Sequence, residues 1–573
     1  MIWLLPLAVA LPLLLSGVAA RPAAWWTPGL AALPALVAAF VIPLGEILSL
    51  PWILLGMHLG LDETTRLFLF FTAFLWAVGG ITASEALRQD PAAGRFRVFF
   101  LLAMSGNLLL VVAQDLVSFY TGFAMMGIAS YALVIHEGHR ASLRAGKIYL
   151  ILTLVGELAL FVALVLIASQ VGLMMPDAAD LATLPGGVIA LVILGFGIKA
   201  GLVPAHFWAP LAYPAAPIAA AAMLSGAMSK TALLGWLRFL PLGDVALPAW
   251  GTLLIFLGLV SMFYALTVGL LQSNPRVILA YSSISKAGLF VLVLGIILID
   301  PRLAPVGTAG LVLYATHHAL VKGGLFLGLG LRRPDRDPDR TQVWVLAGLV
   351  LLAVAMAGGP LTSGAIAKDA LKPLLNLTDW GWLETAVMIA AVLTTLLMIR
   401  FLFTLWSFPL AARPGDHDPL DPSSTQPASL AVWAVLVGIV AIMPFVFATP
   451  GAWLTNWNIL LIAFVIAWPL LDAARHHRGL FRPLQHAVPP GDLVVPLRAL
   501  RIALVWSGRQ ALRRLARGLA RPQTRLTAWI VQWFGPAPAD PERSLRDWAT
   551  AGLLWLVILV ALLLALVLTV QNP

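Results

Sequence analysis

Long apolar runs separated by short polar stretches repeat from one end of the chain to the other. Each run is close to the roughly 20 residues that an α-helix needs to cross a bilayer. The short period-two segments that are typical of a membrane β-barrel do not occur. The pattern predicts an all-α polytopic membrane protein with 14–16 transmembrane helices. The candidate spans are 2–20, 28–50, 65–84, 95–113, 115–135, 147–172, 186–209, 214–236, 249–272, 277–299, 305–331, 342–375, 385–411, 428–449, 452–472 and 548–570.

The two ends of the chain and its charged loops complete this map. The first run has no basic segment before it, so we interpret it as a retained first span. Proline-rich charged loops occupy 332–340 and 412–427. Within 496–525 arginines alternate with apolar residues, which favours an amphipathic helix on the membrane surface, although a basic cytoplasmic tail is the alternative. The last span begins at Trp548, an aromatic residue typical of a membrane interface.

The composition of the chain limits the kinds of site that it can contain. Of the 573 residues, 61% are hydrophobic and 11% are charged, and none is cysteine. The absence of cysteine excludes disulfides, thiolate metal sites and iron–sulfur ligation on this chain. The net charge of +10 indicates contact with anionic lipid rather than with nucleic acid.

Lysine is confined to one region of the sequence. The seven lysines all lie between residues 147 and 372, whereas every other basic residue of the chain outside this region is arginine or histidine. Burial makes lysine able to lose its proton, but arginine stays protonated. An ionisable residue at bilayer depth costs about 2.5–3.5 kcal/mol on insertion scales and usually marks a functional pathway. Two lysines lie at span edges, and we expect five to lie inside spans: Lys199, Lys230, Lys286, Lys322 and Lys368.

Further titratable residues fall in the same zone. Glu157 is in the middle of a predicted span, and His317 and His318 precede Lys322. His318 and Lys322 are four residues apart, so they share a helix face and could exchange a proton. Adjacent histidines point about 100° apart on a helix and no carboxylate stands at ligand spacing, so we expect no metal site here. We also expect no cofactor on this chain.

Two spans carry helix breakers beside a lysine. Gly195, Gly197, Gly201 and Pro204 surround Lys199, and the segment 358–360, Gly-Gly-Pro, precedes Lys368. A broken helix at membrane depth survives only where it is buried in protein or lines a wet cavity. We therefore expect water to reach Lys199, with His206 extending the path. Ordinary proline kinks are the alternative interpretation.

The segments that carry these residues resemble a known family. "GFGIKAGLVPAHFWAPLAYPAAPIAAAAMLSGAMSKTALLGWLRF", "NPRVILAYSSIS", "HHALVKGGLFLGLG" and "PLTSGAIAKD" are similar to the antiporter-like, proton-conducting subunits of respiratory complex I, membrane-bound hydrogenases and Mrp Na⁺/H⁺ antiporters. The resemblance covers about 95–400 and is closest to the hydrogenase and Mrp antiporter branches. It implies two inverted five-helix repeats, each with a broken helix, and a line of buried charges at mid-membrane.

The resemblance also assigns roles by position. Lys199 matches the lysine of the first half-channel, and Lys230 matches the lysine that connects the two halves. His318 and Lys322 match the central relay, and Lys368 matches the lysine in the second broken helix near the exit.

The sequence departs from the family at several positions. Where the family has Trp-Glu this chain has Phe123 and Ala124, so the acidic partner of Lys199 is missing. An Asp and a His of the family are replaced by Leu211 and Tyr213. Arg276 keeps a basic position, and Lys286 stands where Gln is common. We hypothesise that Glu157, on the next helix, substitutes for the missing acid.

These observations predict a subunit of a larger ion-translocating complex in the bacterial inner membrane, which either conducts protons alone or exchanges them for cations. No bond chemistry is expected on this chain, whose partners would be other membrane subunits and a soluble redox or hydrolase module. One alternative is the membrane partner of a dissolved-inorganic-carbon uptake complex, and another is a scaffold whose channel has decayed. The predicted divisions are 1–94, N-terminal helices; 95–240 and 241–411, the half-channel repeats; 412–490, peripheral helices; and 491–573, the amphipathic helix and final span.

Overall fold

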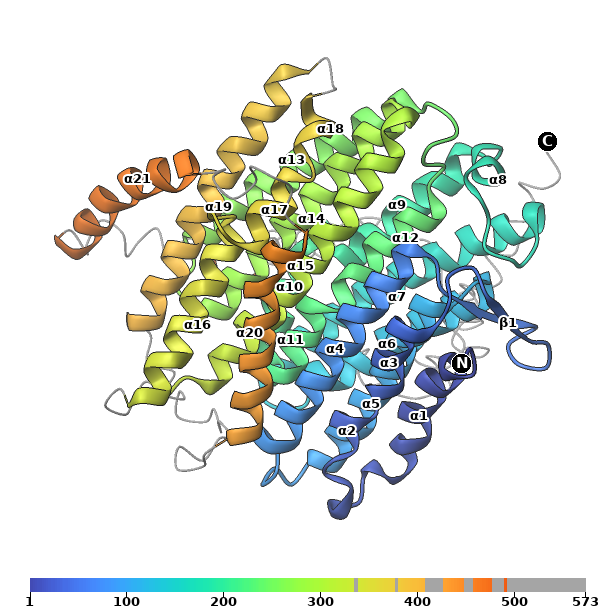
Figure 1. Ribbon diagram of the computed structural model, residues 1–573, viewed down its shortest axis with the longest axis horizontal. Coiled ribbons are helices and arrows are strands. Elements are labelled where there is room, and N and C mark those ends of the chain that lie inside the picture. Colours follow the sequence, from blue (N-terminus) through green and yellow to red (C-terminus); the bar gives the residue numbers. More distant parts are fainter. Residues whose placement is uncertain (334–338, 377–379, 408–425, 448–456, 477–488, 492–573) are drawn as a thin grey trace, which may run out of the picture. The chain divides into compact units, whose positions relative to one another are not determined.

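A computed structural model describes residues 1–333, 339–376, 380–407, 426–447, 457–476 and 489–491. These residues belong to one compact unit, Met1–Val494. The unit is built almost entirely of helices, many of which run side by side (Figure 1). The amphipathic helix expected within 496–525, the final span expected at 548–570 and most of the loop 412–427 lie outside the described residues.

The N-terminal part differs from the expectation of two plain spans before residue 60. It contains α1 (Leu4–Ala19), η1 (Pro22–Ala24), α2 (Thr27–Leu30), α3 (Leu33–Val41), β1 (Ile47–Leu50), β2 (Met57–Gly60) and α4 (Glu63–Ala86). The predicted span 28–50 is wrong in its second half, because α3 ends at Val41 and an antiparallel hairpin follows. Pro43 lacks an amide donor and Gly45 has φ +80°, so neither residue continues a helix here.

Two sets of five membrane segments follow in the same order. Each set has three continuous helices, then a broken one, then a fifth. The first set contains α5 (Ala93–Val112), α6 (Leu116–Val134), α7 (Arg140–Val171), the short α8 (Ala178–Ala182), α9 (Gly186–Ala200), η2 (Ala205–Trp208), α10 (Ala209–Ala215), α11 (Ile218–Gly226), η3 (Met228–Lys230) and α12 (Thr231–Phe239).

The second set begins after a short surface turn. It contains α13 (Pro248–Leu270), α14 (Pro275–Ile299), η4 (Pro301–Leu303), α15 (Ala304–Leu331), α16 (Arg340–Ala357), α17 (Ser363–Asp369), α18 (Lys372–Asn376) and α19 (Gly381–Ser407). Two further helices, α20 (Pro427–Phe447) and α21 (Trp457–His476), complete the described chain. The repeated order agrees with the two-repeat expectation, and the exact division of the chain stays a prediction.

Both predicted helix breaks are present. The first lies between α9 and η2, where Gly201 takes the left-handed conformation with φ +75°. The second lies between α16 and α17, where Gly358 has φ +76°. Glycine adopts this conformation without the steric cost that a Cβ would add. A third break, between α11 and α12, is one that the sequence pattern did not indicate; there the chain passes through η3 and ends that turn at Lys230.

Eleven helices of the described residues are long and apolar enough to cross a membrane. Helix α15, with 28 residues, is long enough but carries two histidines and a lysine that lower its hydropathy. Three more apolar helices are shorter: Leu4–Ala19, Thr27–Val41 and Trp457–Ala467. The protein is therefore a multi-pass membrane protein, and the total of 14–16 spans stays a prediction because the last one is outside the described residues.

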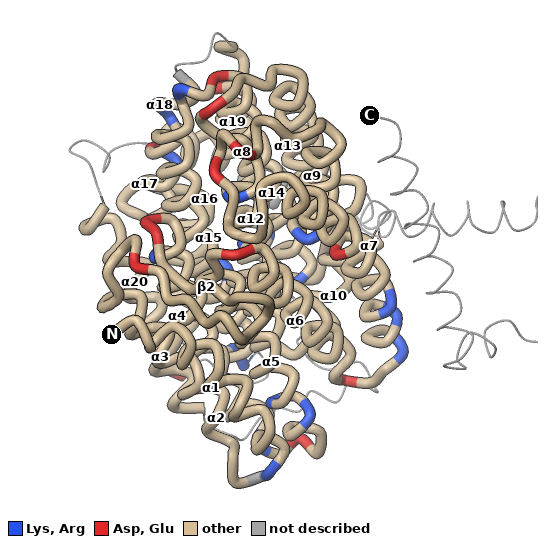
Figure 2. Tube along the Cα trace, turned by 90° about the vertical axis from the view of Figure 1, so that its right-hand side faces the viewer, with Lys and Arg blue, Asp and Glu red and all other residues tan. Residues whose placement is uncertain are grey.

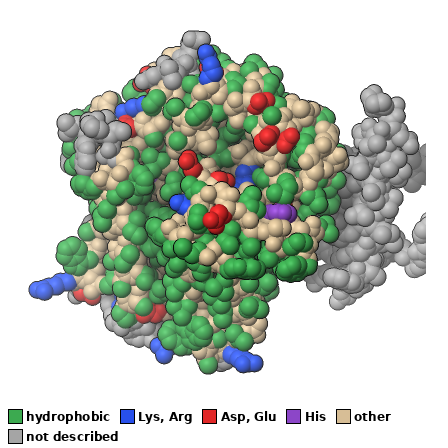
Figure 3. All heavy atoms as spheres, turned by 45° about the vertical axis from the view of Figure 1, so that its right-hand side comes forward, with side chains coloured by type: hydrophobic (Ala, Val, Ile, Leu, Met, Phe, Trp, Pro, Cys, Tyr) green, Lys and Arg blue, Asp and Glu red, His purple; other side chains and the backbone are tan. Residues whose placement is uncertain are grey.

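Charge is distributed as a bilayer requires. Most charged positions lie toward the ends of the helices, and a few Lys or Arg positions lie within the bundle (Figure 2). Hydrophobic side chains dominate the surface seen in Figure 3, where charged groups gather in a few patches. Helix α14 is the most enclosed of the spans, with 94% of its most apolar window buried. Asn274 caps this helix and Pro275 occupies its first turn, which fixes where it begins.

Candidate functional site: a line of buried lysines

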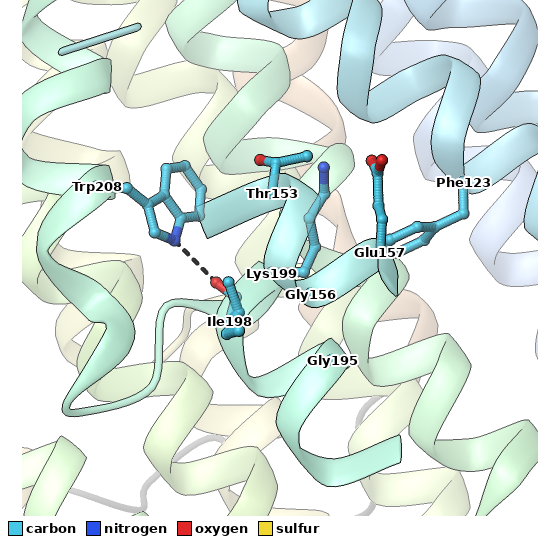
Figure 4. Close-up of a pocket in the computed structure, with 8 residues that line it drawn as sticks. All are labelled: Phe123, Thr153, Gly156, Glu157, Gly195, Ile198, Lys199 and Trp208. Atoms are coloured by element: carbon cyan, nitrogen blue, oxygen red, sulfur yellow. Dashed lines mark hydrogen bonds between the residues drawn. The ribbon is translucent and has the colours of Figure 1, made fainter. Parts of the chain in front are cut away.

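Lys199, at the end of α9, points into a small cavity. The cavity is lined by the following residues (Figure 4): Phe123, Thr153, Gly156, Glu157, Gly195, Ile198, Lys199 and Trp208. The Lys199 ammonium is buried and has no hydrogen-bond partner among the described residues. It lies 5.4 Å from the centre of the Phe123 ring and 5.9 Å from that of Tyr149, and both rings can stabilise a cation.

Glu157, on α7, shares this cavity with Lys199. The two side chains point toward the same side of it, and the two groups interact electrostatically (Figure 4). They do not form an ion pair within 4.0 Å in the described part of the chain, and Oε1 of Glu157 is buried without a hydrogen-bond partner. Gly127 of α6 makes room for this oxygen, because a Cβ at Gly127 would clash with it. The carboxylate of α7 therefore reaches the helix that carries Ala124.

Two supporting residues lie elsewhere. His206 is completely buried in η2, where its ring meets Tyr264 of α13 at 5.1 Å and Tyr281 of α14 at 6.3 Å. It is not among the residues that line the Lys199 cavity. Arg276, in the first turn of α14, donates to the main-chain oxygen of Pro214 at 3.3 Å. Neither residue is hydrogen-bonded to the Lys199 ammonium, which has no hydrogen-bond partner among the described residues.

Lys230 is placed by the third helix break. Its ammonium donates to the main-chain oxygen of Ser225 at 2.5 Å and to the hydroxyl of Ser229 at 3.1 Å. The Ser225 oxygen belongs to the last turn of α11, where carbonyl groups lack intrahelical partners and carry partial negative charge. Interrupting the helix therefore supplies the acceptor that the buried ammonium needs.

Three titratable residues of α15 lie fully inside the protein. Lys322 donates to the main-chain oxygen of Leu279, on α14, at 2.6 Å. His317 is hydrogen-bonded through Nδ1 to the hydroxyl of Ser363, in α17, at 2.8 Å. Neither ring nitrogen of His318 has a hydrogen-bond partner among the described residues. The shared face expected for His318 and Lys322 is present and the two interact electrostatically, but they are not hydrogen-bonded to each other.

Lys286 and Lys368 lie toward α19 and the second broken helix. Together with Lys199, Lys230 and Lys322 they form what we call the line of lysines. Lys286 donates to the hydroxyl of Thr394, in α19, at 3.1 Å. Lys368 donates to the main-chain oxygen of Ala357, the last residue of α16, at 2.5 Å. Gly358 follows that acceptor, and a Cβ at this position would clash with the Lys368 ammonium. The left-handed turn thus both ends the helix and leaves space for the lysine.

The lysines share a type of partner. Lys230, Lys286, Lys322 and Lys368 all donate to main-chain or hydroxyl oxygens, which are neutral. The buried carboxylates of the described residues are Asp115 and Glu157. Asp115 accepts hydrogen bonds from the amide of His58, in β2, and from the amide of Ser118, in the first turn of α6. Both of its carboxylate oxygens are therefore already used by main-chain amides. Glu157 is therefore the buried acid that is available to the line.

Sequence reasoning missed the hydroxyl partners of the line. Ser225, Ser283, Ser363 and Thr394 are buried, but serine and threonine are common in membrane helices and no single-sequence signal separates these from the rest. Among the described residues, no group of three or more His, Asp or Glu side chains could hold a metal ion.

The sequence matches one protein family across the region that holds the line. The match, over residues 113–397, is to the transmembrane family described as NADH:quinone oxidoreductase/Mrp antiporter. It begins just before α6 and ends within α19, so it includes all the buried lysines.

Individual relatives agree with this match. The chain is 31% identical over 343 residues to hydrogenase-4 component B of Escherichia coli, covering 56% of this chain and 51% of that relative. It is 30% identical over 372 residues to a subunit of the Na⁺/H⁺ antiporter of Alkalihalophilus pseudofirmus, covering 61% of this chain and 74% of that relative. The chain thus spans about half the length of the first relative and about three quarters of the second.

The fold has a solved counterpart. A chain of the membrane-bound sulfane sulfur reductase, an archaeal respiratory membrane complex, superposes with a TM-score of 0.68 at 21% identity, covering 92% of this chain and 98% of that one. Sequence and fold therefore agree: the protein belongs to the NADH:quinone oxidoreductase/Mrp antiporter transmembrane family.

Proposed function

We propose that the chain is a proton-conducting membrane subunit of a larger ion-translocating complex. Protons move along Lys199 with Glu157, Lys230, Lys322 with His318, and Lys368. His206, His317, Lys286 and Arg276 support this path. No bond is made or broken on the chain itself, and the driving force comes from a partner.

The observation that carries the proposal is the neutrality of the lysines' acceptors. A buried ammonium held by a carboxylate is locked in its charged form, because losing the proton would leave an uncompensated buried anion. An ammonium held by a carbonyl or hydroxyl oxygen can lose its proton without leaving such a charge. Lys230 and Lys322 are both held in the second way. They are thus suited to alternate between the two protonation states.

Glu157 is proposed to supply the acid that the first half-channel otherwise lacks. It lines the Lys199 cavity and its free Oε1 lies against α6, the helix that carries Ala124, where the family resemblance implies a glutamate. Thr153 and Trp208 line the same cavity. If Glu157 and Lys199 share a single proton, the net charge of the pair would depend on the protonation state of the next lysine along the path.

The partners and the location are part of the proposal. The relatives include a hydrogenase component and an antiporter subunit, and the solved counterpart comes from a respiratory membrane complex. By analogy, this chain would contact other membrane subunits in a bacterial inner membrane, with a soluble redox module or a cation gradient as the energy source.

The test is proton flux in liposomes that contain the chain with its co-purifying subunits. Flux is driven by an imposed membrane potential or cation gradient and followed with an entrapped pH-sensitive dye. Lys322→Gln keeps much of the side-chain volume but cannot carry a proton, so we expect a loss of about 100-fold or more. Glu157→Gln should also reduce the flux, and adding Ala124→Glu to it should restore part of the rate.

A matched control is Lys147→Gln, since Lys147 is exposed at the edge of α7. That variant should conduct like the wild type. Equal flux in wild type and Lys322→Gln would contradict conduction and favour a scaffold with a decayed channel. Unchanged flux in Glu157→Gln would remove Glu157 from the path while leaving the lysines in it.

A further inference from the structure

Two serine hydroxyls lie between the lysines of the two halves. The hydroxyl oxygens of Ser225, on α11, and Ser283, on α14, are 3.0 Å apart, and the bond is buried. Both residues are enclosed: Ser225 is fully buried and Ser283 is 7% exposed. The proposed conduction path does not use either hydroxyl.

Each serine is linked to a different lysine through a main-chain oxygen. Lys230 donates to the main-chain oxygen of Ser225 itself at 2.5 Å. Ser283 donates to the main-chain oxygen of Leu279 at 3.2 Å, and Lys322 donates to that same oxygen at 2.6 Å. Because two donors share one acceptor, Lys322 and Ser283 lie within reach of each other, directly or through one water molecule.

Lys199, Lys286 and Lys368 have no such connection in the described residues. Lys199 has no hydrogen-bond partner, Lys286 contacts a threonine of α19, and Lys368 contacts the end of α16. The serine pair therefore marks the one place in the described structure where two lysines of the line, from different halves, meet the same hydrogen-bonded group. Tyr213, which replaces a titratable residue of the relatives, also interacts with the Ser225 side chain.

We propose that the Ser225–Ser283 pair is the proton-transfer link between Lys230 and Lys322. A hydroxyl can accept one proton while it gives up its own. When Lys230 turns from the carbonyl to the hydroxyl of Ser225, its N–H proton passes to that oxygen. The Ser225 proton passes to Ser283, and the Ser283 proton passes to the neutral amine of Lys322. One proton has then moved between the lysines, and both hydroxyls are neutral again.

This inference rests on the proposed conduction, so both are measured in the same preparation. The full complex is reconstituted with Ser225→Ala or Ser283→Ala, each of which removes one oxygen and adds no bulk. Flux should fall about tenfold or more, because water replaces a positioned hydroxyl only imperfectly. The fall should occur without a change in thermal unfolding or in subunit composition, and the solvent isotope effect in D₂O should rise as proton transfer becomes limiting.

Ser282→Ala is the matched control. Ser282 is on the same helix and is 1% exposed, but its hydroxyl has no hydrogen-bond partner in the described structure. It should conduct like the wild type, and Ser283→Thr, which restores a hydroxyl, should recover flux relative to Ser283→Ala.

The possible results separate the two proposals. If Ser225→Ala and Ser283→Ala show the same proton flux and the same isotope effect as the wild type, the serine link is overturned. The flux of Lys322→Gln would still test conduction in that case. A fall in flux that tracks a fall in thermal stability, with an unchanged isotope effect, would also overturn it in favour of a purely structural pair. If Lys322→Gln conducts like the wild type, the serine link fails together with the conduction on which it depends.

Discussion

At the scale of residues, a single glycine determines how side chains are placed around Lys199. Gly127 gives the Glu157 carboxylate its place beside α6, and Tyr149 donates to the Gly127 carbonyl at 3.1 Å, so the same residue also positions one of the two rings beside Lys199. The position of the acid beside this lysine therefore depends on the absence of one side chain, and one of the rings depends on the main chain of the same residue.

Gly127→Ala should displace Glu157 from the cavity. The added methyl group would clash with Oε1, and overpacking of this kind costs about 1–3 kcal/mol. We expect a moderate fall in the unfolding temperature and a fall in proton flux similar to that of Glu157→Gln. Thermal unfolding in detergent and the liposome assay check both parts.

Gly438→Ala is the control, because nothing lies within 4 Å of a Cβ built at Gly438. It should leave the flux unchanged and should not lower stability. Normal flux in Gly127→Ala would show that the carboxylate position is not important for conduction.

The burial of four of the five lysines could be predicted from sequence, whereas Lys368 is only half-buried, and the partners of the lysines could not be predicted. Lysine at bilayer depth is costly, so its repeated presence in apolar spans is a strong signal. The acceptors of Lys322 and Lys286 come from α14 and α19, through contacts that depend on how the helices pack. A single sequence contains no direct record of those contacts.

At the scale of elements, the helix breaks are of two kinds. At the first, Gly201 has a left-handed conformation and the nearest atom to an added Cβ is 3.7 Å away. At the second, Gly358 has the same conformation and an added Cβ would clash with the Lys368 ammonium. Only the second break therefore depends on glycine for space as well as for conformation.

This difference predicts unequal effects of the same substitution. Gly201→Ala should cost about 1 kcal/mol, the strain of a left-handed alanine, and should reduce flux little. Gly358→Ala should cost more, because it also displaces Lys368 from the end of α16, and its flux should fall sharply. Thermal unfolding and proton flux measured on both variants test this.

Equal losses of stability and flux in Gly201→Ala and Gly358→Ala would contradict the distinction. Such a result would indicate that backbone strain, and not the position of Lys368, limits both breaks.

The two breaks beside Lys199 and Lys368 could be predicted from sequence, whereas the break before Lys230 and the hairpin could not. Gly201 and Gly358 were recognised because glycine interrupts an apolar run next to a lysine. The break before Lys230 has one glycine, Gly226, and no proline, and a single glycine within an apolar run is also tolerated inside a helix. The hairpin at 47–60 is rich in Leu, Ile and Met, and short apolar runs do not distinguish a strand from a helix.

At the scale of the whole molecule, the part of the chain that matches the family is the part that contains the lysines. The family match covers residues 113–397 and therefore includes both broken helices. Helices α1 to α5 precede this region and α20 and α21 follow it, so they lie outside the part that the family match covers.

The chain should purify as part of a complex. Gentle extraction followed by mass spectrometry of co-purifying chains should find further membrane subunits together with a redox module or other antiporter subunits. A soluble zinc-bearing partner alone would instead support the inorganic-carbon alternative. A homogeneous single chain that transports ions in liposomes would contradict the complex.

The exposed hairpin allows movements next to the buried path to be followed from a distance. Asp115 holds the hairpin through the amide of His58 and caps α6 through the amide of Ser118, so these two elements are fastened at one side chain. Trp52, in the turn between β1 and β2, is 79% exposed. A spectroscopic label at Trp52 should therefore report displacements of α6, which carries Phe123 and Gly127, without any probe being placed near the protons themselves.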